Sequence, residues 1–545
     1  MTEPEAGAKS AGHPHLNRED PEELLDPSRD PGAVAFGASG TEAGTDLSWL
    51  ALLRHRVERR ATGSSRYPWW VLTALLAGLL ALNITFTVFI VALPKVAGEF
   101  HTSVVALTWT MTGPLLAYGL AAPVLGRVGD LFGHRRLYLF GLAGAMVSAV
   151  LTALAGSVGM LLFARTLDGI QGAATGTASM ALIMSAFSKE DRVKAMGWWT
   201  LVGAGGPVIG VSLGAPIIQA FGWRALFWMQ LGLLVVAFMV VALIIPRPGH
   251  HRAGLVDHAP AKKVDGWKGM DWIGSWTLSG SVTAVMLGLS FGPSWGWTSA
   301  LVLGLFVLSA VLLLAFAARI RSTDNPLIPP EYFTRRNFVM PMVVRAAGNF
   351  AYFGAFYLFP LLMEQGYGYS IAAVGAIAIA RPLLFALASP IAGYTTVRVG
   401  ERNSSVAGMV CLTGSLAIFS LLQVHSSAAW VVLALALSGL GMGVAMPATS
   451  STMANEVDPS RFGVMGSAQM LAMQVGEVAG IQVLVTLQQA AMHREGLGKH
   501  SARAAQLATF RWPFALGAAV AAIGIAASLS IRDLDRSGVN ADVAS

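Results

Sequence analysis

The sequence is poor in charged residues and nearly devoid of cysteine. Only 12% of its 545 residues are charged and 54% are hydrophobic, against about 25% and 45–50% in an ordinary soluble domain. A mean hydropathy of +0.59 requires an apolar surface, so lipid surrounds most of the chain. The single cysteine, Cys411, lies in an apolar run and has no partner for an intrachain disulfide. These features exclude a disulfide scaffold, a collagen-like or wholly disordered chain, and a cytosolic enzyme.

Motifs of cofactor and metal chemistry are also absent. The sequence has no Gly-x-x-x-x-Gly-Lys-Ser/Thr phosphate loop, so ATP is not expected to supply the energy directly, and it has no His-Glu-x-x-His pair. His250, His251 and His258 lack cysteine or acidic ligands at a fixed spacing, which argues against a metal site. We therefore expect no enzyme activity, no cofactor and no bound metal. The net charge is +7, and the basic residues that produce it lie mainly between the apolar runs. Their placement indicates membrane topology rather than nucleic-acid binding.

Long apolar stretches are abundant, and fourteen of them reach the length of about 17–25 residues that crosses a bilayer as a helix. They are continuously apolar, without the alternation of a barrel strand. The sequence therefore predicts an all-α polytopic membrane protein with spans at residues 69–92, 105–125, 137–156, 158–184, 195–218, 225–246, 272–292, 298–318, 338–362, 371–396, 404–423, 428–450, 464–489 and 511–531.

The segments outside these stretches set the topology. Lys and Arg concentrate in alternate loops, which predicts that both termini are cytoplasmic. The predicted organisation is an N-terminal cytoplasmic tail with a basic collar (1–66), a six-helix bundle (67–246), a cytoplasmic loop (247–271), two inserted helices (272–319), a second cytoplasmic loop (320–337), a second six-helix bundle (338–531) and a C-terminal cytoplasmic tail (532–545). We expect the tail before residue 50 to be disordered, because it is acidic and holds few large apolar residues.

An internal repeat explains the two bundles. Pro123, Gly126, Gly133 and Arg135 recur as Pro390, Gly393, Gly400 and Arg402, each displaced by 267 residues. The same displacement places the ninth span on the first, so two six-helix units flank an inserted pair. Two parallel repeats around a site at the membrane midplane are the plan of a secondary transporter that opens alternately to each side.

The sharpest motif follows the second span. Gly126 and Gly133 permit a tight turn, Arg135 and Arg136 form its basic end, and Asp130 lies between the glycines. Asp130 is expected to cap the N-terminus of the following helix or to pair with a base across the pore, which would make a latch that protonation opens. The second repeat has Val397 at the position of Asp130, so the latch is one-sided.

The fourth and fifth spans carry two further candidates. Arg165 and Asp168 are three residues apart on one helix and can pair, either for proton coupling or only to neutralise the arginine. In the fifth span small residues form one stripe, which can serve transport or only close packing, and a proline is expected to kink the helix. The residues of this stripe are Gly203, Gly206, Pro207, Gly210 and Gly214.

Isolated polar groups inside other spans complete the set. Arg345 is expected either to line the substrate cavity or to extend towards the membrane surface, and Arg381 lies near the middle of its span. Glu477 is a candidate proton carrier and substrate contact, with a salt bridge to an arginine as the alternative. Asn83, in the first span, is a candidate cavity residue.

These motifs resemble the major facilitator superfamily, in particular its fourteen-helix drug:proton antiporter family of EmrB/QacA type. The resemblance covers about residues 69–531 and rests on Gly126, Asp130 and Gly133 with the basic end, on Arg165, and on the glycine–proline motif of the fifth span. It implies two six-helix bundles plus two inserted helices, proton transfer at Arg165, and export rather than import. The chain departs from the family at Asp168, where Gln is usual, and at Thr85, where many relatives have Asp and where Asn83 is the nearest substitute.

The sequence as a whole therefore predicts an exporter in the bacterial cytoplasmic membrane that is driven by the proton gradient. Asp168 and Glu477 are the expected carriers, Arg165 stabilises the ionised acid, and Asp130 latches the gate. Its expected partners are the lipid bilayer, protons and a small hydrophobic or amphipathic substrate, with no nucleic acid, and the expected state is a monomer. Alternatives are an exporter of an endogenous lipid, siderophore or antibiotic, and a proton-coupled nutrient importer.

Overall fold

The computed structural model describes residues 66–102, 107, 109–245, 270–494 and 503–533. All of these residues belong to one compact unit. The expected disordered tail, the basic collar, the loop 247–271 up to residue 269 and most of the C-terminal tail lie outside the described residues. All regular elements of the described ranges are helices.

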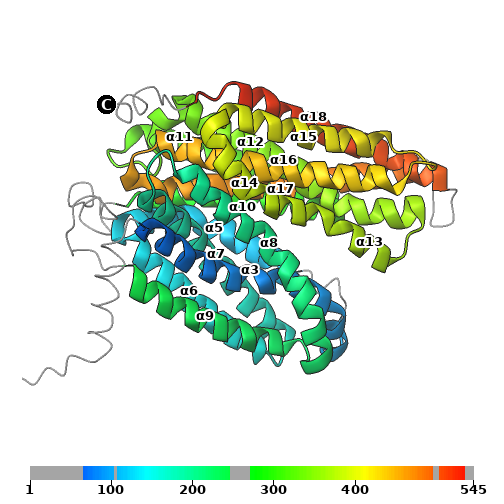
Figure 1. The fold of residues 1–545 in the computed structure, drawn as a ribbon, viewed down its shortest axis with the longest axis horizontal. Helices are drawn as coiled ribbons and strands as arrows, with labels where there is room; N and C mark the ends of the chain where they lie inside the picture. Colours follow the sequence, from blue (N-terminus) through cyan, green and yellow to red (C-terminus); the bar gives the residue numbers. More distant parts are fainter. Residues whose placement is uncertain (1–65, 103–106, 108, 246–269, 495–502, 534–545) are drawn as a thin grey trace, which may run out of the picture. The chain divides into compact units, whose positions relative to one another are not determined.

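The first six long helices form one bundle (Figure 1). They are α3 (Tyr67–Glu99), α5 (Trp109–Phe132), α6 (His134–Ala153), α7 (Val158–Ala186), α8 (Arg192–Phe221) and α9 (Arg224–Ile244). Their shared core contains Leu75, Tyr138, Leu142 and Met184, which are wholly buried or nearly so. Residues at three- and four-residue spacing on each helix meet in this core, as expected for helices that bury one face.

The remaining helices form an inserted pair and a second bundle. The inserted pair is α10 (Trp272–Trp295) and α11 (Ala300–Ser322). The second bundle is built from η4 (Pro330–Thr334), α12 (Arg336–Leu361), η5 (Leu362–Tyr367), α13 (Ile371–Ala378), α14 (Ala380–Val399), α15 (Glu401–Leu421), α16 (Ala428–Glu456), η6 (Pro459–Arg461), α17 (Phe462–Arg494) and α18 (Arg503–Leu529).

Each of the fourteen predicted stretches falls on a helix, with one correction. The stretch 371–396 is divided into α13 and α14 at Ile379. Eleven helical segments of the described residues are long and apolar enough to cross a membrane, and α7, α8 and α10 are not among them. Gly, Ser and Thr lower the apolar content of α7 and α10. The count of fourteen crossings therefore stays a prediction.

The repeat has a backbone counterpart in two turns. Gly133 follows α5 and Gly400 follows α14, and each is the residue before the next helix. Their φ angles are 99° and 93°, in a region that residues with a Cβ rarely adopt. Only glycine fits this turn easily, which explains why it recurs at both positions of the repeat.

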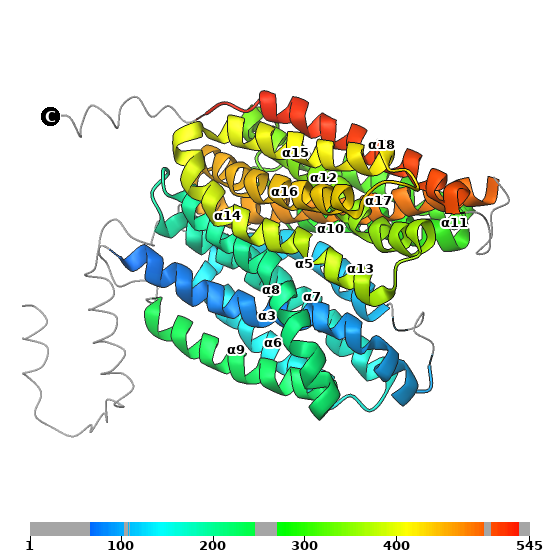
Figure 2. The same cartoon turned by 45° about the vertical axis from the view of Figure 1, so that its right-hand side comes forward.

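The two bundles meet through helices that the repeat relates (Figure 2). Helix α14 packs on α8, and α17 packs on α5. A Cβ on Gly126 would lie 2.5 Å from the carbonyl oxygen of Gly463, and one on Gly393 would lie 2.9 Å from that of Val193. Glycine at these positions therefore lets the helices of opposite bundles approach closely. The inserted α10 packs beside α5 and α17, and α11 packs mainly on α10.

Candidate transport site and gate

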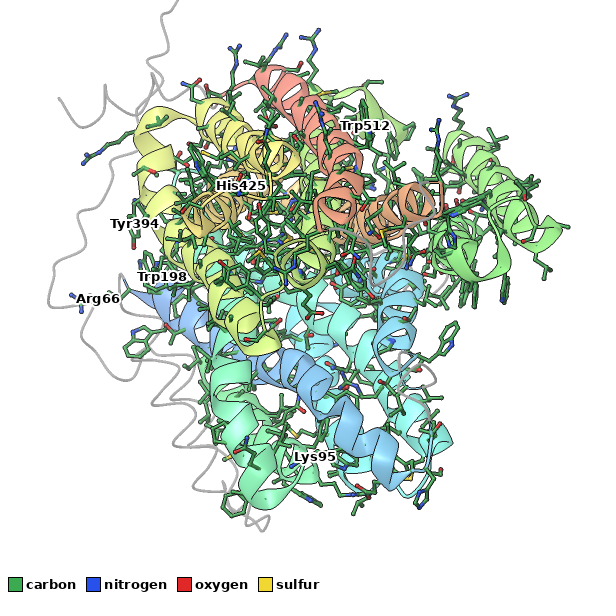
Figure 3. The ribbon with its side chains drawn as sticks, turned by 90° about the vertical axis from the view of Figure 1, so that its right-hand side faces the viewer. Arg66, Lys95, Trp198, Tyr394, His425 and Trp512 are labelled. Carbon is green, nitrogen blue, oxygen red and sulfur yellow. The ribbon has the colours of Figure 1, made fainter. Side chains whose placement is uncertain are left out.

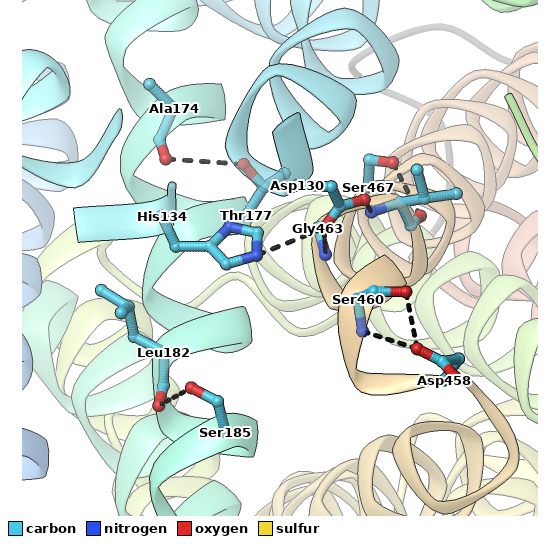
Figure 4. Close-up of polar contacts among 11 residues, drawn as sticks. Asp130, His134, Ala174, Thr177, Leu182, Ser185, Asp458, Ser460, Gly463 and Ser467 are labelled. Atoms are coloured by element: carbon cyan, nitrogen blue, oxygen red, sulfur yellow. Dashed lines mark hydrogen bonds and ion pairs between the residues drawn. The ribbon is translucent and has the colours of Figure 1, made fainter. Parts of the chain in front are cut away.

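Asp130 joins the two bundles at the end of α5. Its Oδ1 accepts a hydrogen bond from the backbone N of Gly463 at 2.7 Å, and its Oδ2 accepts one from the N of Val464 at 3.1 Å. His134 Nε2 lies 3.2 Å from Oδ1, and the Asp130 side chain is 1% exposed. Figure 4 shows the carboxylate between His134 and Gly463. The acid therefore sits at the N-terminus of α17, where orphan N–H groups and the helix dipole favour negative charge.

This geometry corrects the expected partners of Asp130. The capped helix is α17 of the other bundle rather than the following helix α6, whose N-cap residue Gly133 makes no side-chain cap. The partner across the interface is backbone N–H rather than a base. Gly126 lies inside α5 rather than in the predicted turn, and its close approach to Gly463 brings the carboxylate within reach of these groups. We call the end of the bundles that holds Asp130 and Gly463 the latch end.

The basic residues after Gly133 have separate roles. Arg135 donates from Nε to the carbonyl oxygen of Ile245 at 2.6 Å and from Nη2 to that of Ala242 at 3.1 Å. It thereby satisfies carbonyl groups at the C-terminus of α9, where a cation is also favoured by the helix dipole. Arg136 is exposed. The predicted basic end is thus one structural arginine and one surface arginine.

Arg192 is a second inter-bundle contact, which the sequence analysis missed. Its Nη1 donates to the carbonyl oxygen of Ala454 at 3.2 Å and to Oδ1 of Asn455 at 2.8 Å, at the end of α16. Its guanidinium also lies 4.9 Å from the ring centroid of Phe462. Burial lowers the pKa of Arg192 to about 10. The only sequence signal is a cation just before a predicted span, which has many ordinary explanations.

Further contacts close the same end. Trp198 and Tyr394, both labelled in Figure 3, come from α8 and α14, and the indole Nε1 lies 3.5 Å from the tyrosine hydroxyl. A cavity of about 370 Å³ at the latch end is lined by residues of both bundles and the segment between them, among them Lys189, Arg192, Arg335 and Asn455. The structure is therefore a state in which the two bundles are joined at the latch end.

Arg165 and Asp168 form an ion pair inside the first bundle. Asp168 also accepts hydrogen bonds from the Ser148 hydroxyl and, at 3.4 Å, from Gln171 Nε2. Arg165 lies over the ring of Phe89 at 5.0 Å from its centroid. Ser148 belongs to α6 and Phe89 to α3, so the pair faces the interior of its own bundle.

The contact of α7 with α17 uses a different face of the helix. Gly466 of α17 lies against Thr177 and Met180 of α7. Thr177 follows Asp168 by nine residues, which rotates it about 180° around the helix axis. The two expected proton carriers, Asp168 and Glu477, are therefore not brought into one site.

The glycine stripe of α8 packs within the first bundle. A Cβ on Gly206 would lie 2.7 Å from Cβ of Asn83 on α3. Gly210 and Gly214 are buried, whereas Gly203 is exposed, and α8 runs as one helix through Pro207. Asn83 donates to the carbonyl oxygen of Leu79 at 2.8 Å within its own helix.

Helix α8 instead approaches α14 through a glycine outside the motif. A Cβ on Gly197 would lie 2.6 Å from the carbonyl oxygen of Ser389. Gly197 could not be found from the sequence, since a lone glycine gives no sign of which neighbouring helix it faces. The stripe and the inter-bundle contact thus lie on different faces of α8.

Two of the three intramembrane charges of the second bundle are buried, and none of the three forms an ion pair among the described residues. Arg345 is 2% exposed and donates from Nη2 to Ser450 Oγ and, at 3.3 Å, to the carbonyl oxygen of Met446. Burial of this kind contradicts the alternative in which Arg345 extends to the membrane surface. Arg381 is 1% exposed and donates to the carbonyl oxygen of Tyr352. Glu477 is half-buried on α17, and among the described residues it forms no ion pair, so the expected salt-bridge alternative is not formed.

These elements define a class of protein. Two six-helix bundles related by a repeat, joined at one end by a carboxylate on a helix terminus and holding buried charges in their interior, are the architecture of a secondary membrane transporter. Among the described residues no group of three or more His, Cys, Asp or Glu side chains could hold a metal ion.

The comparisons with known proteins give the family. Residues 73–271 and 267–481 match the family model of the Major Facilitator Superfamily, and the chain belongs to this superfamily. The crystal structure of the human organic anion transporter MFSD10 (TETRAN) has a similar fold, with a TM-score of 0.60 and 18% identity over 85% of this chain and 99% of that one. The chain is therefore a transporter and not an enzyme. The pattern Gly-x-Ser-x-Gly occurs at residues 210–214 and 292–296, within α8 and at the end of α10, and neither is a strand–turn–helix elbow.

Several relatives are named for resistance and export. The tetracenomycin C resistance and export protein of Streptomyces glaucescens is 28% identical over 428 residues, 78% of this chain and 77% of the relative. The multidrug transporter protein MdtP of Bacillus subtilis is 25% identical over 76% of this chain and 74% of its own length. The multidrug resistance protein Stp of Mycobacterium tuberculosis is 24% identical over 72% and 71%, respectively.

Proposed function

We propose that the protein exports hydrophobic or amphipathic small molecules across the bacterial cytoplasmic membrane in exchange for protons. The names of its relatives support export of drugs or antibiotics. The observation that carries the mechanism is the Asp130 carboxylate on the N-terminus of α17. A carboxylate in this place stabilises the joined state only while it is ionised, so its protonation weakens the closure of the latch end.

The proposed cycle uses alternating access of the two bundles. In this cycle the chain crosses the membrane fourteen times, with both termini in the cytoplasm, and the latch end faces the cytoplasm. The joined state is therefore open to the outside. Protonation of Asp130 and of an acid within the bundles favours the inward-open state, which takes substrate from the cytoplasm or the inner leaflet. The acids within the bundles are Asp168, which pairs with Arg165, and Glu477, which forms no ion pair among the described residues. Because their surroundings differ, we expect them to have different roles.

The energetics allow this coupling. One charge moved through 100 mV releases roughly 2.3 kcal/mol, which sustains a gradient of an uncharged substrate of about fifty-fold. A monomer suffices for the cycle, because each chain holds both bundles.

Transport in proteoliposomes tests the proposal. The purified full chain is reconstituted, and accumulation of several dye classes is measured under an imposed pH gradient, with ATP and without it. We expect ATP-independent transport that collapses when a protonophore is added. Transport that persists only with ATP, or that ignores the pH gradient and the membrane potential, contradicts proton coupling.

Three variants test the roles of Asp130, Asp168 and Glu477 in transport separately. Glu477→Gln and Asp168→Asn are expected to uncouple transport from the pH gradient, whereas Asp130→Asn slows the cycle with less effect on substrate binding. Arg136→Gln is the matched control, because this arginine of the same motif is exposed. Unchanged pH-driven transport in both bundle variants would remove Asp168 and Glu477 as carriers.

A further inference from the structure

Two arginines of the second bundle carry charges that nothing in the described residues neutralises. Arg345 and Arg381 are among the largest fully buried side chains of the protein. Their hydrogen-bond partners are neutral: Ser450 and the carbonyl oxygen of Met446 for Arg345, and the carbonyl oxygen of Tyr352 for Arg381. Neither forms an ion pair, and the Nε atom of each is buried without any hydrogen-bond partner.

The two guanidinium groups lie along one strip of α12. Arg345 is on α12 itself, and Arg381 reaches from α14 to lie 3.5 Å over the ring of Tyr352. Tyr352 follows Arg345 by seven residues, or two helical turns, and so lies on the same face, roughly 10 Å along the axis. Both cations therefore border the face of α12 that packs towards α14 and α16.

The strip is aromatic at Tyr352 and polar near Arg345, where Asn349 and Ser450 are buried. The rings of Phe353 and Phe385 meet that of Tyr352 edge to face, at centroid distances of 5.2 and 5.5 Å. Glu477 belongs to α17, which packs on α12 so closely that Gly476 touches the backbone of Ala346. Among the described residues Glu477 nevertheless forms no ion pair with either arginine.

A buried cation without a counter-charge is costly in a low-dielectric interior. An anion that pairs with the free N–H groups of a guanidinium removes this cost, and the geometry of a carboxylate or a phosphate matches the guanidinium fork. A lipophilic cation would be repelled by the same two charges. The aromatic surroundings suit the apolar body of an amphipathic molecule.

We propose that Arg345 and Arg381 form the anion subsite of the transporter and that the exported compound is an amphipath with a carboxylate or a similar anionic group. This inference rests on the proposed export function and specifies its substrate class. The anionic head lies along the strip of α12 between the two arginines, and the apolar body contacts the aromatic rings.

Binding of three matched probes tests the subsite in the wild type. The probes are pyrenebutyrate, its methyl ester and pyrenebutyl-trimethylammonium, which share one apolar body. Binding to the full chain in phosphatidylcholine nanodiscs is followed by energy transfer from tryptophan to pyrene, with empty nanodiscs as the blank. We expect the carboxylate to bind at least tenfold more tightly than the ester, a difference of 1.4 kcal/mol, and the cation to bind most weakly. Equal binding of carboxylate and ester overturns the inference.

Arginine variants locate the site. Arg345→Gln and Arg381→Gln are each expected to reduce the preference for the carboxylate over the ester at least fivefold and to leave ester binding nearly unchanged. Arg345→Lys, which keeps the charge, should retain part of the preference, and Arg136→Gln should retain all of it. A full preference in both glutamine variants overturns the assignment, and ester binding reports whether a variant has kept its fold.

Two outcomes distinguish this inference from the proposed function. Proton-driven transport of the ester or the cation without any preference for the carboxylate overturns the anion subsite and leaves export standing. Absence of proton-driven transport for all three probes contradicts the proposed function itself. Competition with dihexanoyl phosphatidylglycerol shows whether the bound anion is also a lipid headgroup: displacement of pyrenebutyrate extends the class to lipid anions, and no displacement restricts it to carboxylates.

Discussion

The two bundles descend from one repeat but treat their buried arginines in opposite ways. In the first bundle Arg165 is neutralised by Asp168, which Ser148 and Gln171 also hold. In the second bundle Arg345 and Arg381 have only neutral partners. In both bundles the arginine Nε is buried without a hydrogen-bond partner, so the difference between them is the counter-charge that Arg165 has. We therefore expect the first bundle to keep its charge for structure or proton coupling and the second to offer its charges to substrate.

The two repeat-related turns also differ in charge, because one carries an acid where the other has valine. Asp130, three residues before Gly133, reaches the N-terminus of α17 across the interface. Val397 stands at the corresponding place before Gly400, and there Asp533 accepts from the backbone N of Arg402 at 2.8 Å within the second bundle. Of these two turns, the one after α5 therefore has an acid that reaches the other bundle, while α8 and α14 meet through Gly197, Gly393 and the Trp198–Tyr394 contact.

The largest effect is expected when the Arg165–Asp168 ion pair of the first bundle is broken. Asp168→Asn leaves Arg165 buried without a counter-charge and should lower the free energy of unfolding by about 3–5 kcal/mol. Arg345→Gln removes a charge that is already unpaired, so its cost should be far smaller. Thermal unfolding of both variants in one detergent measures the difference. If Arg345→Gln proves the more damaging, then Arg345 has a counter-charge and the contrast between the bundles is wrong.

A smaller effect is expected at the interface glycine of the latch. Gly126→Ala places a Cβ 2.5 Å from the carbonyl oxygen of Gly463, and such overpacking typically costs about 1–3 kcal/mol. Gly414→Ala is the matched control, because no atom lies within 4 Å of its Cβ position. That change should be neutral or slightly stabilising. Similar melting temperatures for the two variants would show that α5 and α17 are not in close contact.

The smallest effect concerns the end of the first bundle opposite the latch. The hydrogen bond from Trp223 Nε1, at 2.7 Å, and the neighbouring Arg224 hold the pKa of Glu99 below its usual value. A lowered pKa gives stability that is present above the unfolded value and is lost as the pH falls through the folded value. Glu99→Gln should therefore cost less than about 1 kcal/mol at pH 7, since the pair is exposed.

The pH dependence supplies the check on Glu99. The difference in melting temperature between Glu99→Gln and the wild type should shrink as the pH falls through the lowered pKa of Glu99, because the wild-type carboxylate then becomes neutral as well. A difference that stays constant from pH 7 to pH 3 would mean that the charge of Glu99 does not contribute.

The helices could be predicted from the sequence because hydropathy and length act locally. Each of the fourteen apolar stretches falls on a helix, and the positive-φ turns at Gly133 and Gly400 follow from the repeat. The partners in the site could not be predicted in this way. Gly463 is 333 residues from Asp130, and an N–H at a helix terminus has no side-chain signature. The direction in which Asp168 faces also depends on packing against α6, which the spacing of charges along α7 does not reveal.

Spin-label distances across the latch end test the central claim most directly. Labels at Lys189→Cys and Arg402→Cys, in a Cys411→Ser background, report the separation of the two bundles from exposed positions. We predict a short distance in the wild type at pH 8 and a longer one in Asp130→Asn at the same pH, because the amide carries no charge for the N-terminus of α17. A short distance that Asp130→Asn leaves unchanged would contradict a latch that depends on the charge of Asp130.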